Sequence, residues 1–394
     1  MAELSHLRRP PASMSWRTVR RPRGAGDVIR TAAPLIVAMV VLSLYTNSKN
    51  PAFLSRSALE NILTQVAVLG ILAVGQTLLV VGGQLDLSVG SVVSFTSVIG
   101  AYLYSHHWSE PAILLVMLAI GAGVGLLWGL LVTYLRVPAF ILTLGGLSAF
   151  SSLASVISHN RPISVIGAFS SLGFGQWLGL PAPAVVFLAA VVLGALVLHG
   201  TRFGRQLFAL GSSEDSAYLA GLPTRGIKLR LFLMNGLLVG VAGLVQLGRL
   251  SAGDPSSGRG LELTSIAAIV LGGVALTGGR GTMFGSLLGT LTFGVTDASL
   301  VFLNVGGAWQ SLVTGGVLIL AVTVTALAEA RRGRISSMRR GLMGLTSHLL
   351  QRPTQPSMAS NGSHAAGDVE SGRPAEHGPR HDVSPTPPDE ARQK

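Results

Sequence analysis

The sequence has no cysteine and only three lysines among its 394 residues. Without cysteine, disulfide bonds and thiol chemistry are excluded. None of the lysines follows a glycine, so the chain lacks the G-x-x-x-x-G-K-[ST] loop that cradles nucleotide phosphates and cannot itself be a P-loop ATPase. No loop combines serine, histidine and aspartate, or several metal ligands, as a catalytic centre would. Catalysis by this chain is therefore not expected.

Charge is scarce as well. Charged residues make up 12% of the chain and hydrophobic residues 49%, with a mean hydropathy of +0.56, which excludes an ordinary soluble globular protein. Fifty glycines fit closely packed membrane helices. The net charge of +12 comes from basic residues in the tails and between apolar runs, the distribution that membrane topology produces. Binding of nucleic acid is therefore not expected.

Ten apolar runs lie between residues 31 and 330. Several approach the ~20 residues that a helix needs to cross a bilayer, and the shorter ones can extend into their flanks. The runs are Thr31–Tyr45, Ile62–Val81, Val89–Tyr104, Ala112–Tyr134, Phe140–Ile157, Ala182–Leu198, Leu231–Leu247, Thr264–Thr277, Met283–Leu303 and Gln310–Ala328. We predict an all-α, multi-pass membrane protein with about ten transmembrane helices, the first of them an uncleaved helix rather than a signal peptide.

Basic residues beside these runs predict the orientation. Nineteen fall on one side, in the N-terminal tail, at Arg136, in the central loop, at Arg280 and in the segment 331–340. The other side has five, namely Lys49, Arg56, Arg161, Arg249 and Arg259. The asymmetry places both termini and the central loop in the cytoplasm. We divide the chain into a basic tail (1–30), a transmembrane domain (31–330) with its loop at 200–230, and a C-terminal tail (331–394), basic at first and then disordered.

The polar stretch Thr201–Lys228 lies between two long apolar runs and predicts a short helix with clear ends. Ser212 can cap the first turn while Asp215 reaches back, as in a capping box. Gly221 suits the left-handed residue that follows a last turn. We therefore predict about two turns of helix held at the membrane face by flanking basic residues, with an ordinary cytosolic loop as the alternative.

This stretch resembles the coupling loop of ABC importer permeases, and more narrowly that of ribose- and xylose-type sugar transporters. In that family the short helix sits in a groove of a separate ATPase subunit and transmits its closure to the membrane helices. The resemblance assigns this coupling role to Arg202, Gly204, Arg205, Gly211, Glu214, Ala217 and Gly221. Ala217 and Gly221 lie four residues apart, so we expect them to form a small-residue face toward the ATPase. The sequence departs from the family at Ser216, usually alanine, and at Tyr218, often basic.

The segment GGQLDLSVG, residues 82–90, is the most specific short match. An aspartate between two apolar runs costs about 2.5–3.5 kcal/mol on insertion scales unless it is capped, paired or hydrated. One interpretation is structural: two glycines reverse the chain, and Asp86 or Ser88 caps the next helix. The other makes the reversal part of a cytoplasmic gate or coupling surface, as its resemblance to the family's GG-x-DLSVG element implies.

Two further segments match the sugar permease family. Residues 138–145 resemble its P-x-F-I-x-T-L-G element, and Gly272–Thr282 contains five glycines in one short reversal. Such a reversal suggests a backbone packed closely against something. The matches together span roughly residues 61–328.

Polar residues within the runs are candidates for the translocation path or gate. They are Gln76, Asp86, Ser88, Asn235, Asp297 and Gln310, with Gln65 and Glu262 as further possibilities. Asp297 is the least easily explained by a helix end; a hydrogen bond to a neighbouring helix is its structural alternative. Tryptophans in these runs are expected to be interface anchors.

The resemblance implies the permease subunit of an ATP-driven importer for a monosaccharide in the bacterial inner membrane. Its partners would be an ABC ATPase, a periplasmic or lipid-anchored solute-binding protein, a second permease chain in a homodimer, and membrane lipid. No cofactor is expected in this chain, because ATP and magnesium would bind the ATPase. The alternative is a self-contained secondary transporter or channel, a class that needs ionisable residues within its spans.

Overall fold

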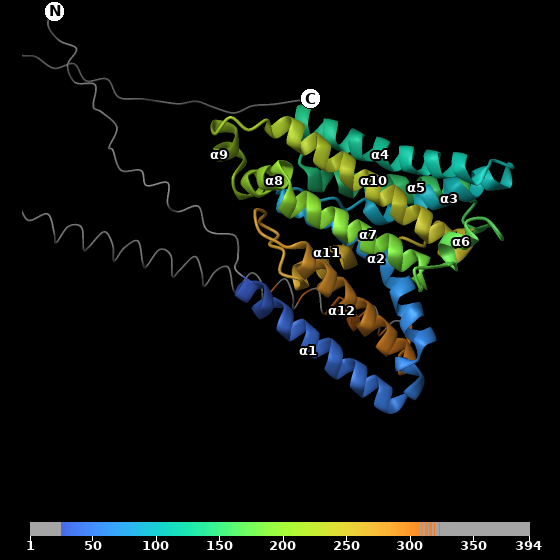
Figure 1. Cartoon of the computed structure of the whole chain (residues 1–394). Helices are drawn as coiled ribbons and strands as arrows, with labels where there is room; N and C mark the ends of the chain where they lie inside the picture. The colour runs from blue at the N-terminus through green and yellow to red at the C-terminus, as the bar shows by residue number, and fades with distance from the viewer. Residues whose placement is uncertain are drawn as a thin grey trace, which may run out of the picture. The chain divides into compact units, whose positions relative to one another are not determined.

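The computed structural model describes residues 25–307 and the single positions 309, 312, 313, 315, 316, 319 and 323, with side chains from residue 32 onward. This part of the chain is predominantly helical (Figure 1). Most of the predicted basic tail, most of the tenth apolar run with Gln310, and the C-terminal tail lie outside the described residues.

In the described residues, seven helices are long and apolar enough to cross a membrane. They are α1 (Ala25–Lys49), α2 (Arg56–Val81), α4 (Glu110–Tyr134), α5 (Ala139–Ile157), α7 (Ala182–Ala195, continued by the π-helical turn η3, Leu196–Gly200), α10 (Thr224–Leu250) and α12 (Met283–Phe302). Two apolar helices are shorter, α3 (Val89–Ser105) and α11 (Leu261–Leu271). Nine of the ten predicted runs therefore contain a helix, and the chain is a multi-pass, helical membrane protein.

Helices α2 and α10 form the buried centre. Their most apolar windows are 89% and 72% buried, against 11% for α1 and 17% for α5. Helix α10 packs along α4 (Figure 1), where a Cβ at Gly125 would meet the backbone of α10 at Phe232 and Gly236. Small residues allow membrane helices to approach this closely.

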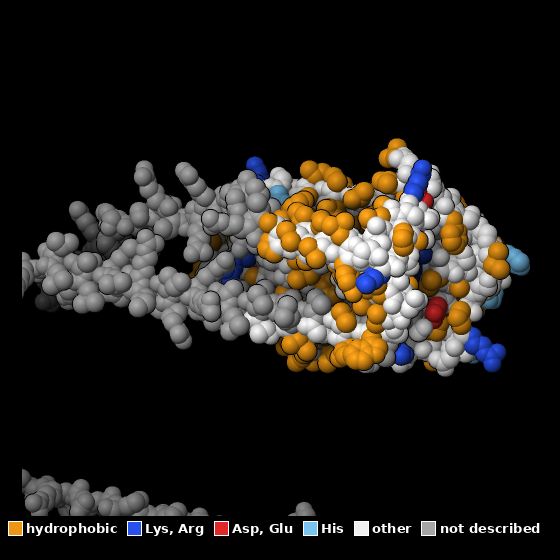
Figure 2. All heavy atoms as spheres, turned by 90° about the horizontal axis from the view of Figure 1, so that it is seen from below, with side chains coloured by type: hydrophobic (Ala, Val, Ile, Leu, Met, Phe, Trp, Pro, Cys, Tyr) orange, Lys and Arg blue, Asp and Glu red, His pale blue; other side chains and the backbone are white. Residues whose placement is uncertain are grey.

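The outward faces of the peripheral helices are apolar. Leu115 and Leu130 of α4, Ile141 of α5 and Val192 of α7 are all exposed. Hydrophobic side chains spread over much of the face shown in Figure 2, and charged ones are few there. These surfaces fit contact with lipid. Their side chains are apolar, and the backbone polar groups behind them are already hydrogen-bonded within the helices.

Helix α11 corrects one predicted span. The run Thr264–Thr277 contains the last eight residues of an 11-residue helix, which is too short to cross a bilayer. The chain reaches α11 through a non-helical segment that packs closely against α3. At two glycines of this segment there is no room for a side chain: a Cβ at Gly253 would meet Ser97 and Ala101, and a Cβ at Gly258 would meet Gly90. Non-helical backbone at membrane depth must be buried in protein, and here the Ser94 hydroxyl accepts from the Gly258 amide at 2.8 Å.

Two sets of connections mark the two ends of the bundle. At one end, which we call the α9 end, the loops after α2 and α11 meet α8 (Arg202–Ser212), beside α9 (Glu214–Leu219). At the opposite end, β1 (Ile163–Ser164) pairs antiparallel with β4 (Ala252–Gly253), and β2 (Gln176–Trp177) pairs with β3 (Leu180–Pro181).

The start of α2 also belongs to the opposite end. The short 3₁₀ turn η2 (Pro51–Leu54) leads into it, and its Phe53 packs edge-to-face on Phe302, the last residue of α12, with ring centroids 5.3 Å apart. The Asn50 side-chain amide donates to the Phe302 carbonyl at 3.3 Å. The neighbouring helix α6 (Ser170–Gly173) packs on the end of α10.

Candidate functional site

Helix α8 begins the central loop and was not predicted as a separate helix. Thr201 caps it by accepting a hydrogen bond from the Gly204 amide at 3.1 Å. The helix is amphipathic: Gly204 and Leu207 are buried, while Arg202 and Arg205 are exposed. Two arginines of the predicted coupling set therefore point away from the bundle, and the glycine packs against the carbonyl end of η3.

Helix α9 follows directly and confirms the predicted short helix, with one correction to its start. The capping residue is Ser213, whose hydroxyl accepts from the Ser216 amide at 3.2 Å. The Ser212 hydroxyl instead donates to the Phe208 carbonyl, because Ser212 is still the last residue of α8. Gly221 has a φ of +79°, the left-handed conformation expected after the last turn.

The two acidic residues of α9 differ in their contacts. Glu214 pairs with Lys228 of α10, with 2.6 Å between Oε1 and Nζ. The predicted bond from Asp215 back to the start of the helix is not formed; Ser213 provides the cap alone. The ion pair ties the short helix to the first turns of a central membrane helix.

The exposed face of α9 differs from the expected one. Ala217 is only 4% exposed and is covered by this chain, so it cannot supply a small-residue face to a partner. Tyr218 and Leu219 are 69% and 84% exposed. These two side chains, together with Gly221, form the accessible end of the helix, and the family departure at Tyr218 therefore lies on its open surface.

Gly211 joins α8 to both glycine-rich reversals. Its Cβ, if present, would overlap the Val81 carbonyl at the end of α2 and lie 2.6 Å from the Gly279 nitrogen. Gly83, in the reversal after α2, has a φ of +74° and also approaches Gly211. A Cβ added to Gly83 would lie 3.3 Å from the Gly211 Cα. The Gly279 amide also donates to the Val81 carbonyl at 2.9 Å. We call this contact among Gly83, Gly211, Gly278 and Gly279 the glycine junction.

The glycine junction explains why the sequence is so rich in glycine at these loops. Gly278 and Gly279 have positive φ values of +83° and +66°, and Gly278 lies against the Gly211 carbonyl. Three loops that are far apart in the sequence therefore meet backbone to backbone. The end of α8 therefore touches the loop after α2 and the loop between α11 and α12 with no intervening side chain.

The segment after Gly83 enters the bundle and is fixed there by a buried polar network around Asp86. Its Oδ1 accepts from the Ser88 amide at 2.8 Å and from the Ser88 hydroxyl at 2.6 Å, and its Oδ2 accepts from the Asn235 side-chain amide at 2.9 Å. The Gln76 side-chain amide donates to the Asp86 carbonyl at 2.5 Å. Four of the predicted pathway residues therefore lie together.

These contacts correct the predicted capping role of Asp86 and Ser88. Neither Asp86 nor Ser88 caps α3, because no side chain bonds to its first-turn amides. Asp86 instead stabilises its own turn and bridges to α10. A buried carboxylate needs such donors, since an uncompensated charge in an apolar interior is very costly.

Two contacts of this network could not be read from the sequence. The Trp128 indole donates to the Ser88 hydroxyl at 3.0 Å, and the Leu87 amide donates to the Thr143 hydroxyl at 3.0 Å. Trp128 was expected to be an interface anchor, yet it is 7% exposed. Thr143 belongs to the family-like element at residues 138–145, which is the only signal that could have suggested it.

The other pathway candidates lie elsewhere. Asp297 is on α12, part-buried, and its carboxylate has no hydrogen bond to another described residue. Glu262 is buried at the start of α11, where it accepts from the Gly260 amide at 3.2 Å. Gln310 is outside the described residues. The structure therefore does not bring Asp297 together with the Asp86 network.

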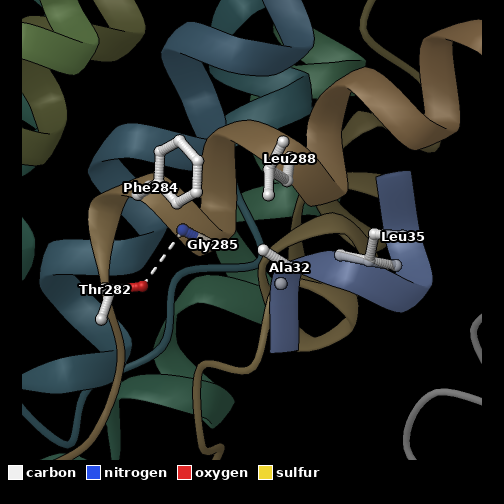
Figure 3. Close-up of a pocket in the computed structure, with 7 residues that line it drawn as sticks. Ala32, Leu35, Thr282, Phe284, Gly285 and Leu288 are labelled. Carbon is white, nitrogen blue, oxygen red and sulfur yellow. Dashed lines mark hydrogen bonds between the residues drawn. The ribbon is translucent and has the colours of Figure 1, made fainter. Parts of the chain in front are cut away.

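A seam between α1 and the start of α12 is too narrow to be a binding site. Figure 3 shows Ala32 and Leu35 of α1 facing Phe284 and Leu288 of α12, with the Thr282 hydroxyl bonded to the Gly285 amide at 3.1 Å. That bond caps α12. The space between these side chains does not admit a water molecule, so the seam is a helix–helix contact.

The chain is similar to known membrane transport proteins. Residues 58–322 match the family described as the permease component of the branched-chain amino acid transport system. The ribose import permease protein of Escherichia coli (strain K12) is 36% identical over 298 residues, covering 73% of this chain and 92% of that protein.

Two relatives carry the names of other pentoses. The xylose transport system permease protein of Haemophilus influenzae is 29% identical over 354 residues, covering 74% of this chain and 94% of that protein. The L-arabinose ABC transporter permease protein of Azospirillum brasilense is 34% identical over 303 residues, covering 77% and 89%. The chain therefore belongs to this family of membrane permease components, among the ABC permeases of the ribose and xylose type.

Proposed function

We propose that this chain is the membrane-spanning subunit of an ATP-driven importer for a monosaccharide in the bacterial inner membrane. A separate ABC ATPase binds ATP and magnesium, a solute-binding protein delivers the sugar, and a second copy of the chain completes the pathway. Both termini lie in the cytoplasm, and the tenth apolar run provides a further span. The names of the pentose permease relatives support a sugar over the amino acids named in the family description.

The observation that carries the proposal is the glycine junction. Closure of an ATPase on ATP moves α9, and Gly211 passes that movement to the loops after α2 and α11. The loop after α2 continues into the Asp86 network, so the movement reaches α10 through Asn235. Coupling between distant sites requires such a contiguous set of contacts.

Reconstitution into proteoliposomes tests the proposal. The chain, together with a candidate ABC ATPase and a candidate solute-binding protein, is expected to import labelled ribose, xylose or L-arabinose only when ATP and magnesium are present on the α9 side. Omission of the ATPase or of the binding protein is expected to abolish uptake. Uptake by the chain alone, driven by an ion gradient, would establish the secondary-transporter alternative instead.

A further inference from the structure

The opposite end of the bundle holds a polar pocket of about 290 Å³. Its walls come from the first turns of α2, from the segment around β2, and from the end of α10. Its polar lining residues are Glu60, Asn61, Thr64, Gln65, Gln176 and Arg249. Of these, only Gln65 was named from the sequence as a candidate for the translocation path. The volume is close to the lower limit of the about 300–1,000 Å³ typical of ligand pockets, which suits a small solute.

Arg249 is held in place before any ligand binds. Its Nη2 donates to the Gln246 side-chain oxygen at 3.2 Å, and the Gln246 amide donates to the Ser257 carbonyl at 3.2 Å. The Arg249 Nε is buried and has no hydrogen-bond acceptor among the described residues. Since buried donors are nearly always paired, this group indicates an acceptor that lies beyond the described residues, and a bound solute in the pocket would supply one.

The facing wall supplies acceptors and further donors. Glu60 of α2 accepts from Arg56 at 2.7 Å and from the Gln176 side-chain amide at 3.3 Å, which joins α2 to β2. Asn61 and Gln65 are exposed and lie four residues apart, so they share a face of α2. The exposed ring of Phe174 stands at the rim.

This chemistry selects the class of ligand. The amide, hydroxyl and carboxylate groups around the Arg249 guanidinium provide hydrogen-bond donors and acceptors side by side. Each hydroxyl group of a neutral sugar can both donate and accept, so it matches such a lining. Glu60 is already paired with Arg56, so it is poorly placed to bind an ammonium group. A neutral polyhydroxylated solute therefore fits better than an amino acid.

We propose that this pocket is a receiving site for a neutral monosaccharide on the side of the permease away from its ATPase. Arg249, Gln65 and Glu60 hold the sugar by hydrogen bonds before the bundle opens. The inference rests on the proposed function for the direction of transport, but binding itself requires neither the ATPase nor ATP.

The absence of cysteine makes a direct test possible. The full chain carrying Asn61→Cys, at a residue that lines the pocket, is placed in nanodiscs and labelled with a charged maleimide. Ribose, xylose and L-arabinose are added in turn. A sugar that binds in the pocket shields the cysteine. When the concentration of that sugar is about ten times its dissociation constant, about one tenth of the sites are empty, so the labelling rate falls about tenfold. Cysteine at Ser109, exposed but not part of the pocket, is expected to react at an unchanged rate.

A second pair of variants identifies the guanidinium. In the Asn61→Cys background, Arg249→Gln is expected to abolish protection by the sugar, whereas Arg259→Gln, at an exposed arginine outside the pocket, keeps it. Equal labelling with and without all three sugars at 100 mM would overturn the site, as would protection by L-leucine alone or protection at Ser109. Protection without ATP-driven uptake would keep the site and refute the importer.

Discussion

Asp86 and Asp254 make the same local turn in different surroundings. Each is followed after one residue by a serine whose amide donates to Oδ1 at 2.8 Å and whose hydroxyl donates to the same atom. Asp86 is 3% exposed and also accepts from Asn235, whereas the Asp254 turn is exposed. A comparison of substitutions at Asp86 and Asp254 therefore separates the contribution of burial to stability from the contribution of the turn itself.

Asp86→Ala is expected to destabilise the chain strongly. It leaves the Asn235 amide and the Ser88 donors without an acceptor in the interior, and each such buried group costs about 1–3 kcal/mol. In Asp254→Ala, water can replace the carboxylate as the acceptor for the Ser256 amide and hydroxyl. This change is therefore expected to alter stability by about 0.5 kcal/mol or less. Thermal unfolding of the two purified variants in one detergent measures the difference. Similar losses would show that the turn, and not the buried network, accounts for the effect.

Gly211→Ala tests the glycine junction. The added methyl would overlap the Val81 carbonyl, so the backbones must separate, and overpacking of this kind costs about 1–3 kcal/mol. Gly226 of α10 is the matched control, because a Cβ there meets nothing within 4 Å. Gly226→Ala is expected to stabilise its helix by up to about 1 kcal/mol.

The distinguishing readout for Gly211→Ala is coupling. We expect the variant to bind its ATPase, because α9 is unchanged, but to lose most ATP-driven uptake. Normal uptake with reduced stability would mean that Gly211 serves packing alone.

At the scale of elements, an ion pair between Glu214 and Lys228 ties α9 to α10 in the described part of the chain. Glu214 and Lys228 are 49% and 12% exposed, so the lysine is held mainly by this chain. A partly exposed pair of this kind contributes about 0–1 kcal/mol, which is enough to orient a six-residue helix without fixing the fold.

Glu214→Lys is therefore expected to leave the chain folded but to weaken ATPase co-purification, because two like charges push α9 away from α10. Exchanging both residues, Glu214→Lys with Lys228→Glu, restores the pair and is expected to recover most binding if its role is internal. If the exchanged variant binds as poorly as the single one, Glu214 contacts the ATPase directly.

The elements that the sequence predicted well are those with long apolar runs or strong capping signals. Gly221 fixed the end of α9, because its φ suits few other residues. The start was misplaced by one residue, since Ser212 and Ser213 are both good caps and only the length of α8 decides between them. The short helix α11 was misjudged because a run of apolar residues does not reveal that the chain enters it from inside the bundle.

The candidate site was predicted only in its parts. Family-like motifs identified Asp86, Gly211 and the two glycine reversals, but their meeting depends on tertiary packing between segments far apart in the sequence. Trp128 and Thr143 have no local pattern that distinguishes a network member from an interface residue or a helix hydroxyl. The exposure of Tyr218 in place of Ala217 likewise depends on how α9 sits against α10.

For the whole molecule, the structure brings the basic loops together. Gly211 and Gly279 meet at the α9 end, so the central loop and Arg280 lie on one side of the bundle. The contact of Asn50 with Phe302 puts the end of α1 and the end of α12 on the other side. An alternating path from α1 through α12 satisfies both groups of contacts. The arginine excess therefore predicts that the α9 end faces the cytoplasm.

Single cysteines in this cysteine-free chain test that orientation. In right-side-out membrane vesicles, a charged maleimide is expected to label Ser170→Cys, beside the polar pocket, and to spare Ser213→Cys until the membrane is permeabilised. Both positions are exposed, so access and not burial decides the outcome. Ser360→Cys, in the C-terminal tail outside the described residues, is expected to follow Ser213→Cys. The reverse pattern at positions 170 and 213 would invert the topology, and a proposed ATPase site on the outer face could not then be supplied with ATP.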